Sequence, residues 1–222
     1  MQNYLLIGML TCFASAQAST LITNGSFESP VVPVGSFTNF LSGSTLIPGW
    51  TVVGAAGGVS IVSGTFSQEC CTFPAEDGAQ WLDLTGLDTN SVEGVEQTVA
   101  TTPGTNYNLS FWVGNIFDPG GIFGTTSTVN VRLGGLGGTL LGAFTNSSTT
   151  RGTQIWQQFT TSFTATGSST TLDFLNADPG NDNSNGLDNV VLTVGAGGIP
   201  EPGTLSLLGL GIIGLGLVRR RM

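Results

Sequence analysis

The chain has 222 residues, a formal net charge of −9 and no histidine. Residues 19–198 hold thirteen acidic side chains against two arginines and no lysine, so the formal charge of this segment is −11. Nucleic acids and anionic lipids bind clustered Lys and Arg, so neither is an expected partner, whereas a divalent cation is a natural counter-charge. The length of the segment suits one domain with a sizeable core.

The N-terminus has the pattern of a signal peptide. An apolar stretch runs from Tyr4 to Ala14, and Ala16-Gln17-Ala18 is a small-x-small cleavage site. No Lys or Arg precedes the apolar stretch, so the usual basic start is absent. The apolar stretch and the cleavage site nevertheless predict that residues 1–18 are a signal peptide that is removed on export.

The segment 19–194 is predicted to form a β-sandwich. It consists of short alternating or apolar runs rich in Thr, Val and Phe, separated by Gly, Asn, Asp, Ser and Pro. Many short strands with turn signals between them are typical of an all-β sandwich. Strands are predicted at 20–22, 49–53, 59–62, 79–84, 92–100, 106–113, 128–133, 139–144, 155–164, 170–175 and 188–194.

The connections between these strands differ in length. Residues 115–127 and 177–186 are predicted to form long polar loops, and the glycine-rich residues 134–138 a tight connection. Residues 195–198, Gly-Ala-Gly-Gly, are predicted to be a flexible linker.

An ordered set of short motifs lies along this segment. Asn24-Gly25-Ser26-Phe27-Glu28 comes first, Glu76-Asp77-Gly78 precedes a predicted strand, and Leu187-Asp188-Asn189-Val190 comes last. In this order and spacing the set resembles the galactose-binding-like jelly-roll domains of secreted carbohydrate-binding modules. The resemblance implies a jelly-roll β-sandwich.

The same resemblance implies a structural calcium ion. In that family the Asn-Gly-x-Phe-Glu turn and an Asp of the last strand meet around calcium, which here implicates Glu28 and Asp188, with Gly25 and Asn24. Calcium prefers about six to eight oxygen ligands, so carboxylates from the two ends of the domain would hold the sandwich closed. The competing interpretation is a simple turn at Asn24 and a strand-end cap at Asp188. The polar run 178–186 lacks the EF-hand pattern and is interpreted as a turn.

The ligand-binding residues cannot be assigned from the sequence. Four tryptophans are able to stack on sugar rings, although most tryptophans of a sandwich this size pack in the core; they are Trp50, Trp81, Trp112 and Trp156. An enzyme is not expected, because the absence of histidine removes the common nucleophilic constellations. The remaining carboxylates have no spacing that distinguishes an acid from a base; they are Glu76, Asp77, Asp83, Glu93 and Glu96.

Cys70 and Cys71 are adjacent and are the only cysteines after residue 18. Ordinary disulfides join Cα atoms about 5.5 Å apart, against roughly 3.8 Å for neighbours. A vicinal disulfide, a free pair and a bridge between molecules therefore all stay open. Zinc is not expected, since no other Cys or His is present to complete its coordination.

The C-terminal residues 199–222 have three parts in a fixed order. Pro200-Glu201-Pro202 comes first, an apolar segment covers 204–218, and Arg219-Arg220-Arg221 precedes the last residue. As a helix the apolar segment would measure about 22 Å at ~1.5 Å per residue, short of the roughly 30 Å hydrocarbon core. The tail resembles the PEP-CTERM sorting signal of Gram-negative bacteria, which implies processing by an exosortase-type membrane enzyme after transient membrane insertion.

Together these features predict an exported protein of the cell surface or biofilm matrix. The resemblance of its domain implies carbohydrate binding, with polysaccharide as a partner. The alternative is a structural surface protein that self-associates and binds no glycan.

Overall fold

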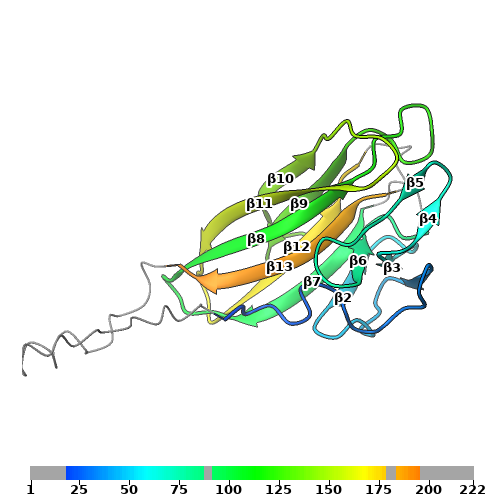
Figure 1. The fold of residues 1–222 in the computed structure, drawn as a ribbon. Helices are drawn as coiled ribbons and strands as arrows, with labels where there is room; N and C mark the ends of the chain where they lie inside the picture. Colours follow the sequence, from blue (N-terminus) through cyan, green and yellow to red (C-terminus); the bar gives the residue numbers. More distant parts are fainter. Residues whose placement is uncertain (1–18, 88–91, 179–183, 196–222) are drawn as a thin grey trace, which may run out of the picture.

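The computed structural model describes residues 19–87, 92–178 and 184–195, which form two facing antiparallel β-sheets (Figure 1). One sheet has the strand order β1-β3-β6-β13-β8-β11, the other β10-β9-β12-β7-β2, and β4 and β5 form a separate hairpin. The strands are β1 Phe37–Phe40, β2 Thr51–Gly54, β3 Val59–Ser63, β4 Ser67–Gln68, β5 Cys71–Thr72, β6 Gln80–Asp83, β7 Glu93–Ala100, β8 Asn106–Asn115, β9 Ser127–Leu133, β10 Thr139–Asn146, β11 Ile155–Thr164, β12 Ser169–Asn176 and β13 Gly186–Val194.

The connectivity is that of a jelly roll. From β6 onward the chain passes to the opposite sheet at every connection except the β9–β10 hairpin. Repeated crossing between two antiparallel sheets is the jelly-roll way of building a sandwich. The prediction of an all-β jelly-roll sandwich is confirmed.

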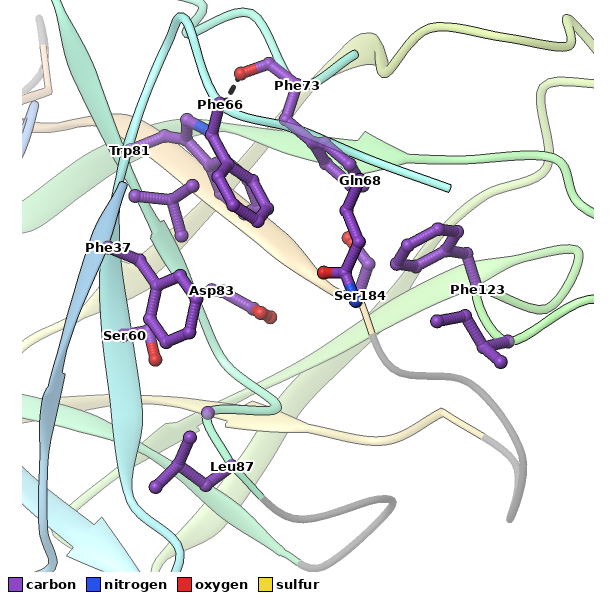
Figure 2. A pocket seen from close by; sticks show the side chains of 13 residues that line it. Phe37, Ser60, Phe66, Gln68, Phe73, Trp81, Asp83, Leu87, Phe123 and Ser184 are labelled. Carbon is purple, nitrogen blue, oxygen red and sulfur yellow. Dashed lines mark hydrogen bonds between the residues drawn. The ribbon is translucent and has the colours of Figure 1, made fainter. Parts of the chain in front are cut away.

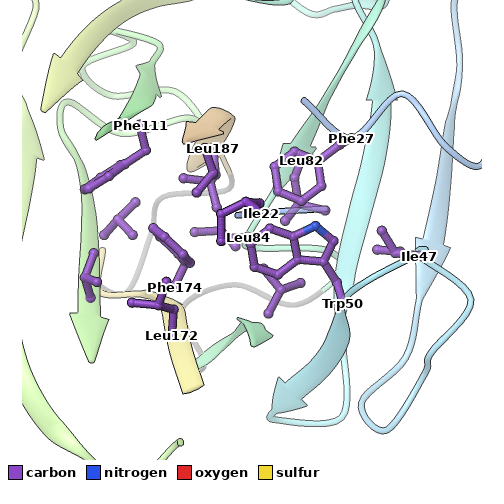
Figure 3. Packing of buried hydrophobic residues seen from close by; sticks show 14 of the residues in the cluster. Ile22, Phe27, Ile47, Trp50, Leu82, Leu84, Phe111, Leu172, Phe174 and Leu187 are labelled. Atoms are coloured by element: carbon purple, nitrogen blue, oxygen red, sulfur yellow. The ribbon is translucent and has the colours of Figure 1, made fainter. Parts of the chain in front are cut away.

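The space between the sheets is filled by the alternating residues of the strands. Along β8, Tyr107, Leu109, Phe111 and Val113 are all buried, as the alternation in the sequence predicted. Phe174 on the facing sheet meets both Phe111 and Trp50 edge-on, at ring-centroid distances of 5.4 and 5.9 Å. Figure 3 shows these side chains meeting in the middle of the sandwich.

Strands β3 and β6 are buried on both faces. Ile61 and Leu82 point into the core between the sheets, whereas Val62 and Trp81 belong to a second apolar cluster on the outer face of the six-stranded sheet. The β4–β5 hairpin and the loop after β8 cover this face and contribute the rest of the cluster. We call it the outer cluster; its buried members are Val62, Cys71, Phe73, Trp81, Ile116 and Phe123.

Several details of the predicted strands were wrong. Residues 20–22 are not a strand: Leu21 donates its N–H to the Leu192 carbonyl at 2.8 Å, but the Leu192 N–H donates to the hydroxyl of Thr20 at 3.2 Å and not to a backbone carbonyl. Strand β1 and the β4–β5 hairpin were missed, since four-residue and two-residue strands are too short to show a period in the sequence. Strand β13 begins at Gly186, two residues earlier than predicted, and its pairing with β8 shifts after Asp188.

Several predicted segments lie outside the described residues. They are the signal peptide 1–18, the linker after Gly195, and the sorting signal 199–222 with its apolar segment 204–218. Within the described ranges, no helix has the length and apolar character needed to cross a bilayer.

Candidate functional site

A cavity of about 230 Å³ opens on the outer face of the six-stranded sheet, beside the outer cluster. Its base consists of residues of β3 and β6 that point away from the sandwich core, and its walls come from β1, the β4–β5 hairpin and the loop after β8 (Figure 2). We call it the outer pocket. The lining residues are Phe37, Ser60, Val62, Phe66, Gln68, Phe73, Trp81, Asp83, Gly86, Leu87, Ile122, Phe123 and Ser184.

Phenylalanine rings form a continuous wall of the outer pocket. Phe66 meets Phe37 edge-on and Phe73 at a tilt, each at a centroid distance of 5.6 Å. Phe73 then meets Phe123 edge-on at 5.1 Å. These contacts fix the rings relative to one another, so the wall is preformed.

Trp81 lies beneath this wall and is almost fully buried. Its ring stacks on Phe73 at 6.1 Å and its indole N–H donates to the Phe73 carbonyl at 3.1 Å. Trp156 packs edge-on against Trp81 at 5.9 Å and donates to the Pro74 carbonyl at 2.8 Å. Both tryptophans therefore support the wall from below.

The β4–β5 hairpin is fixed at its base. Thr72 donates its N–H to the Gly152 carbonyl at 3.1 Å and accepts from the Gln154 N–H at 2.9 Å. Phe73 also donates its N–H to the Phe66 carbonyl at 3.1 Å. These bonds hold in place the segment that supplies Phe66, Gln68 and Phe73 to the pocket.

Cys70 and Cys71 form a vicinal disulfide in this hairpin. Of the three states that the sequence left open, this is the one the structure shows. The side chain of Cys71 is buried in the outer cluster, whereas Cys70 is exposed at the turn between β4 and β5. The bridge therefore lies in the turn that precedes Phe73.

Asp83 is the only titratable side chain among the lining residues that the structure describes. Its Oδ1 accepts three hydrogen bonds, from the Thr85 N–H at 3.0 Å, the Thr85 hydroxyl at 2.8 Å and the Asn185 N–H at 3.2 Å. No described residue donates to Oδ2, and Figure 2 shows the carboxyl pointing into the space between Phe37 and Phe123. Burial raises the pKa of Asp83 to about 6, although its hydrogen bonds lower it.

The predicted calcium ligands Glu28 and Asp188 converge on one short segment of backbone. Glu28 Oε1 accepts from the N–H groups of Ala79 and Gln80 at 2.8 and 2.9 Å. Asp188 Oδ2 accepts from the N–H groups of Glu76 and Asp77 at 2.9 and 3.1 Å. Both carboxylates thus hold the 76–80 segment, one from each end of the domain.

Asp188 also lies in an unfavourable environment for a charge. It is fully buried, and burial raises its pKa to about 8, with Glu76 contributing in the same direction. The side chain of Asn189 donates to Glu76 at 2.9 Å, and the hydroxyl of Ser26 donates to Asp77 at 2.6 Å. The carboxyls of this region are therefore linked to the chain by hydrogen bonds from neutral groups.

The other two predicted ligands, Asn24 and Gly25, have partners of their own. The side chain of Asn24 exchanges two hydrogen bonds with the backbone of Ser29, and the Asn24 carbonyl accepts from the Trp50 indole. The Gly25 carbonyl accepts from the Val190 N–H at 2.9 Å. Within the described ranges, no three acidic or sulfur-containing side chains gather closely enough to hold a metal.

A side chain on Gly25 would overlap the last strand. A Cβ built there would lie 2.1 Å from the Val190 carbonyl oxygen, so only glycine allows this approach. The Asn-Gly turn therefore brings the first segment of the domain against β13, where the Gly25 carbonyl accepts from the Val190 N–H.

Most residues of the outer pocket were not recognised from the sequence. Trp81 and Asp83 were considered there, but Phe37, Phe66 and Phe123 were not. The sequence feature that could have identified these phenylalanines is their position among turn residues. A large apolar side chain in a Gly-, Pro- or Ser-rich segment needs a partner to bury it.

Two family models match the sequence. The first, described as a protein of unknown function (DUF642), matches residues 20–193 and thus most of the chain. The chain belongs to the DUF642 family. The second is the PEP-CTERM protein-sorting motif, matching residues 198–221. The DUF642 domain is thus followed directly by a sorting signal, and the predicted export of the protein to the surface of a Gram-negative cell by an exosortase system is supported.

Solved structures resemble the DUF642 domain at low identity. A bacteriophage CBA120 tailspike protein 4 domain shares 14% identity, with coverage of 79% of this chain but only 21% of the tailspike chain, at a TM-score of 0.44. A CBM4 module shares 20% identity, covering 78% of this chain and 99% of the module, at 0.40. The CBM22-1 xylan-binding domain of Paenibacillus barcinonensis Xyn10C shares 19%, covering 74% and 97%, at 0.43. No curated protein matches the sequence.

Proposed function

We propose that the protein is an exported, non-catalytic carbohydrate-binding protein and that its DUF642 domain holds a sugar in the outer pocket. The observation that carries the proposal is the pairing of a preformed phenylalanine wall with one fixed carboxyl. Sugar rings present apolar C–H faces that pack on aromatic rings, and hydroxyl edges that hydrogen-bond to carboxylates and amides. Both kinds of group face the same cavity, with Asp83, Ser60 and Gln68 as the polar partners.

The arrangement of Ser60 and Asp83 favours a defined orientation of the sugar. They are directly opposite each other on the paired strands β3 and β6, so their polar groups lie side by side on the pocket base. Because Oδ1 of Asp83 is held by three donors, the position of Oδ2 is fixed before a ligand arrives. A preorganised acceptor costs less conformational entropy on binding than a mobile one.

Catalysis is not part of the proposal. Hydrolysis of a glycosidic bond by carboxyl groups requires two of them on either side of the bond. Among the described residues, the lining of the outer pocket contains one carboxyl group, that of Asp83.

A glycan array probed with the purified protein tests this function. Phe37 is 41% exposed at the edge of the pocket, so Phe37→Ala should weaken glycan binding by about tenfold, or about 1.4 kcal/mol, with little loss of stability. Leu140→Ala is the matched control, since Leu140 is 48% exposed on β10 of the other sheet. An array without any bound glycan, or an equal effect of both variants, would contradict the proposal and favour a structural surface protein.

We also propose calcium as a structural ligand at Glu28 and Asp188. In support, both are carboxylates from opposite ends of the domain, and Asp188 is buried beside Glu76, where a divalent cation would offset the repulsion. Hydrogen bonds from the 76–80 backbone already satisfy these carboxylates in part, so the effect of calcium on stability is the decisive measurement.

A further inference from the structure

The described lining of the outer pocket contains a negative group and no positive one. Among the described residues that line it, Asp83 is the single charged one, and neither described arginine is among them. Arg132 donates to the Gly138 carbonyl at 2.9 Å, and Arg151 lies over the Phe117 ring at 5.3 Å from its centroid. A ligand with a carboxylate or sulfate would therefore lose hydration without gaining a counter-ion, whereas a cationic ligand would meet one.

The walls of the pocket also favour a cation. The faces of aromatic rings carry partial negative charge, and ammonium groups bind to them with about 0.5–2 kcal/mol per contact. Phe37, Phe66, Phe73 and Phe123 follow one another around the cavity, with Asp83 pointing into the space between the first and the last (Figure 2). Several rings around one carboxylate form a site suited to an ammonium ion.

The size and the polar groups of the pocket indicate what bears the ammonium. At about 230 Å³ the cavity is smaller than the roughly 300–1,000 Å³ typical for drug-sized ligands, so it accommodates little more than one sugar ring. Ser60, whose hydroxyl donates to Asn39 Oδ1 at 3.0 Å and can still accept, lies opposite Asp83, and Gln68 adds an amide to the lining. A methylated ammonium group has no N–H for these groups, whereas an amino sugar offers both N–H donors and ring hydroxyls.

We propose that the outer pocket selects a hexosamine unit with a free, protonated amine, the amine contacting Asp83 and the ring lying against the phenylalanine wall. The inference rests on the proposed glycan binding and narrows it to de-N-acetylated amino sugars. Acetylation removes the positive charge and adds bulk, so the N-acetylated sugar should bind more weakly. Neutral hexoses, which lack the charge altogether, should bind more weakly as well.

Titration calorimetry with small defined probes tests this selectivity. The probes are glucosamine, N-acetylglucosamine, glucose and choline, each as the monomer or as short oligomers of equal length, at pH 7 and in 0.15 M and 0.5 M salt. We expect glucosamine to bind at least about tenfold more tightly than the acetylated and neutral sugars, and more tightly than choline. This preference should fall to twofold or less in Asp83→Asn and persist in Leu140→Ala.

The outcomes separate the two proposals. If all three sugars bind equally, the amine preference is wrong but glycan binding stands; if no sugar binds, both are wrong. Choline binding as tightly as glucosamine would overturn the recognition of a sugar. If glucosamine binding is unchanged in Asp83→Asn, general attraction to the acidic surface explains it and the inference fails. Phe37→Ala gives a second test at an exposed position, where loss of the amine preference is expected without unfolding.

Discussion

The buried carboxyl of Asp83 should make the stability of the domain depend on pH. Its pKa is about 6 in the folded protein and about 3.8 when exposed, so the folded state binds the proton more tightly. A carboxyl whose pKa is raised on folding stabilises the folded state while it is protonated. This contribution is fully present below about pH 3.8, is lost as the pH rises to about 6, and stays lost above that.

The size of the effect follows from the shift. A difference of roughly two pKa units corresponds to about 3 kcal/mol at 1.36 kcal/mol per unit. Asp83→Asn removes the titration but keeps a side-chain oxygen that can accept from Thr85 and Asn185. The variant should therefore gain about 3 kcal/mol relative to the natural protein between pH 4 and pH 7.

Chemical denaturation at intervals of half a pH unit, without glycan and with a chelator, measures this difference. Asp173 and Asp188 also have raised pKa values, about 7 and about 8, because both are buried. They titrate in both proteins, so their contributions cancel when the two curves are subtracted. Parallel curves, with a difference that changes by less than about 1 kcal/mol over this range, would refute the burial argument for Asp83.

Three further predictions concern calcium, the cysteines and sorting. Saturating calcium at 100 times its dissociation constant should stabilise the domain by about 2.7 kcal/mol and raise its melting temperature by about 5–10 °C. Asp188→Ala should abolish most of this rise, whereas the control Glu69→Gln, at an exposed carboxylate, should not. Equal melting temperatures in chelator and in millimolar calcium would exclude the ion. The Cys70-Cys71 peptide of the exported protein should be lighter than the reduced peptide by two hydrogens, and non-reducing electrophoresis should show a monomer, whereas a ladder that collapses with reductant would indicate bridges between molecules. Mass spectrometry of surface material should find the protein without residues 204–222, and intact peptides ending in Met222 would indicate a permanent anchor instead.

The strands whose two faces differ were predictable from the sequence. Along β7, Val95, Gln97 and Val99 are buried in alternation, and β8 follows the same rule. The period of two is visible there because one face meets the core and the other meets water. The proximity of Glu28 and Asp188 to one segment was anticipated only through the family resemblance, since no local pattern relates residues so far apart in the sequence.

The outer pocket could not be predicted in the same way. In β3 all five residues are buried, because one face meets the sandwich core and the other the outer cluster, so the alternation disappears. The phenylalanines that form the wall lie at the margins of short strands or in loops, where no periodicity applies. Their convergence depends on how the β4–β5 hairpin and the loop after β8 fold over the sheet, which only the tertiary structure defines.

One face of β3 and β6 packs in the sandwich core and the other lines the outer pocket, so different residues of these strands support the fold and contact a ligand. Ile61 and Leu82 face inward and their loss would weaken the sandwich, whereas Ser60 and Asp83 on the same strands face the pocket. Phe73 and Trp81 serve both the packing and the pocket, because they are buried and also border the cavity. Truncating either would lower stability by about 3–5 kcal/mol, so the loss of folded protein would obscure any change in binding. Phe37, at the exposed edge, and the isosteric change at Asp83 are therefore the informative positions, because they alter the chemistry of the pocket while the packing beneath it stays intact.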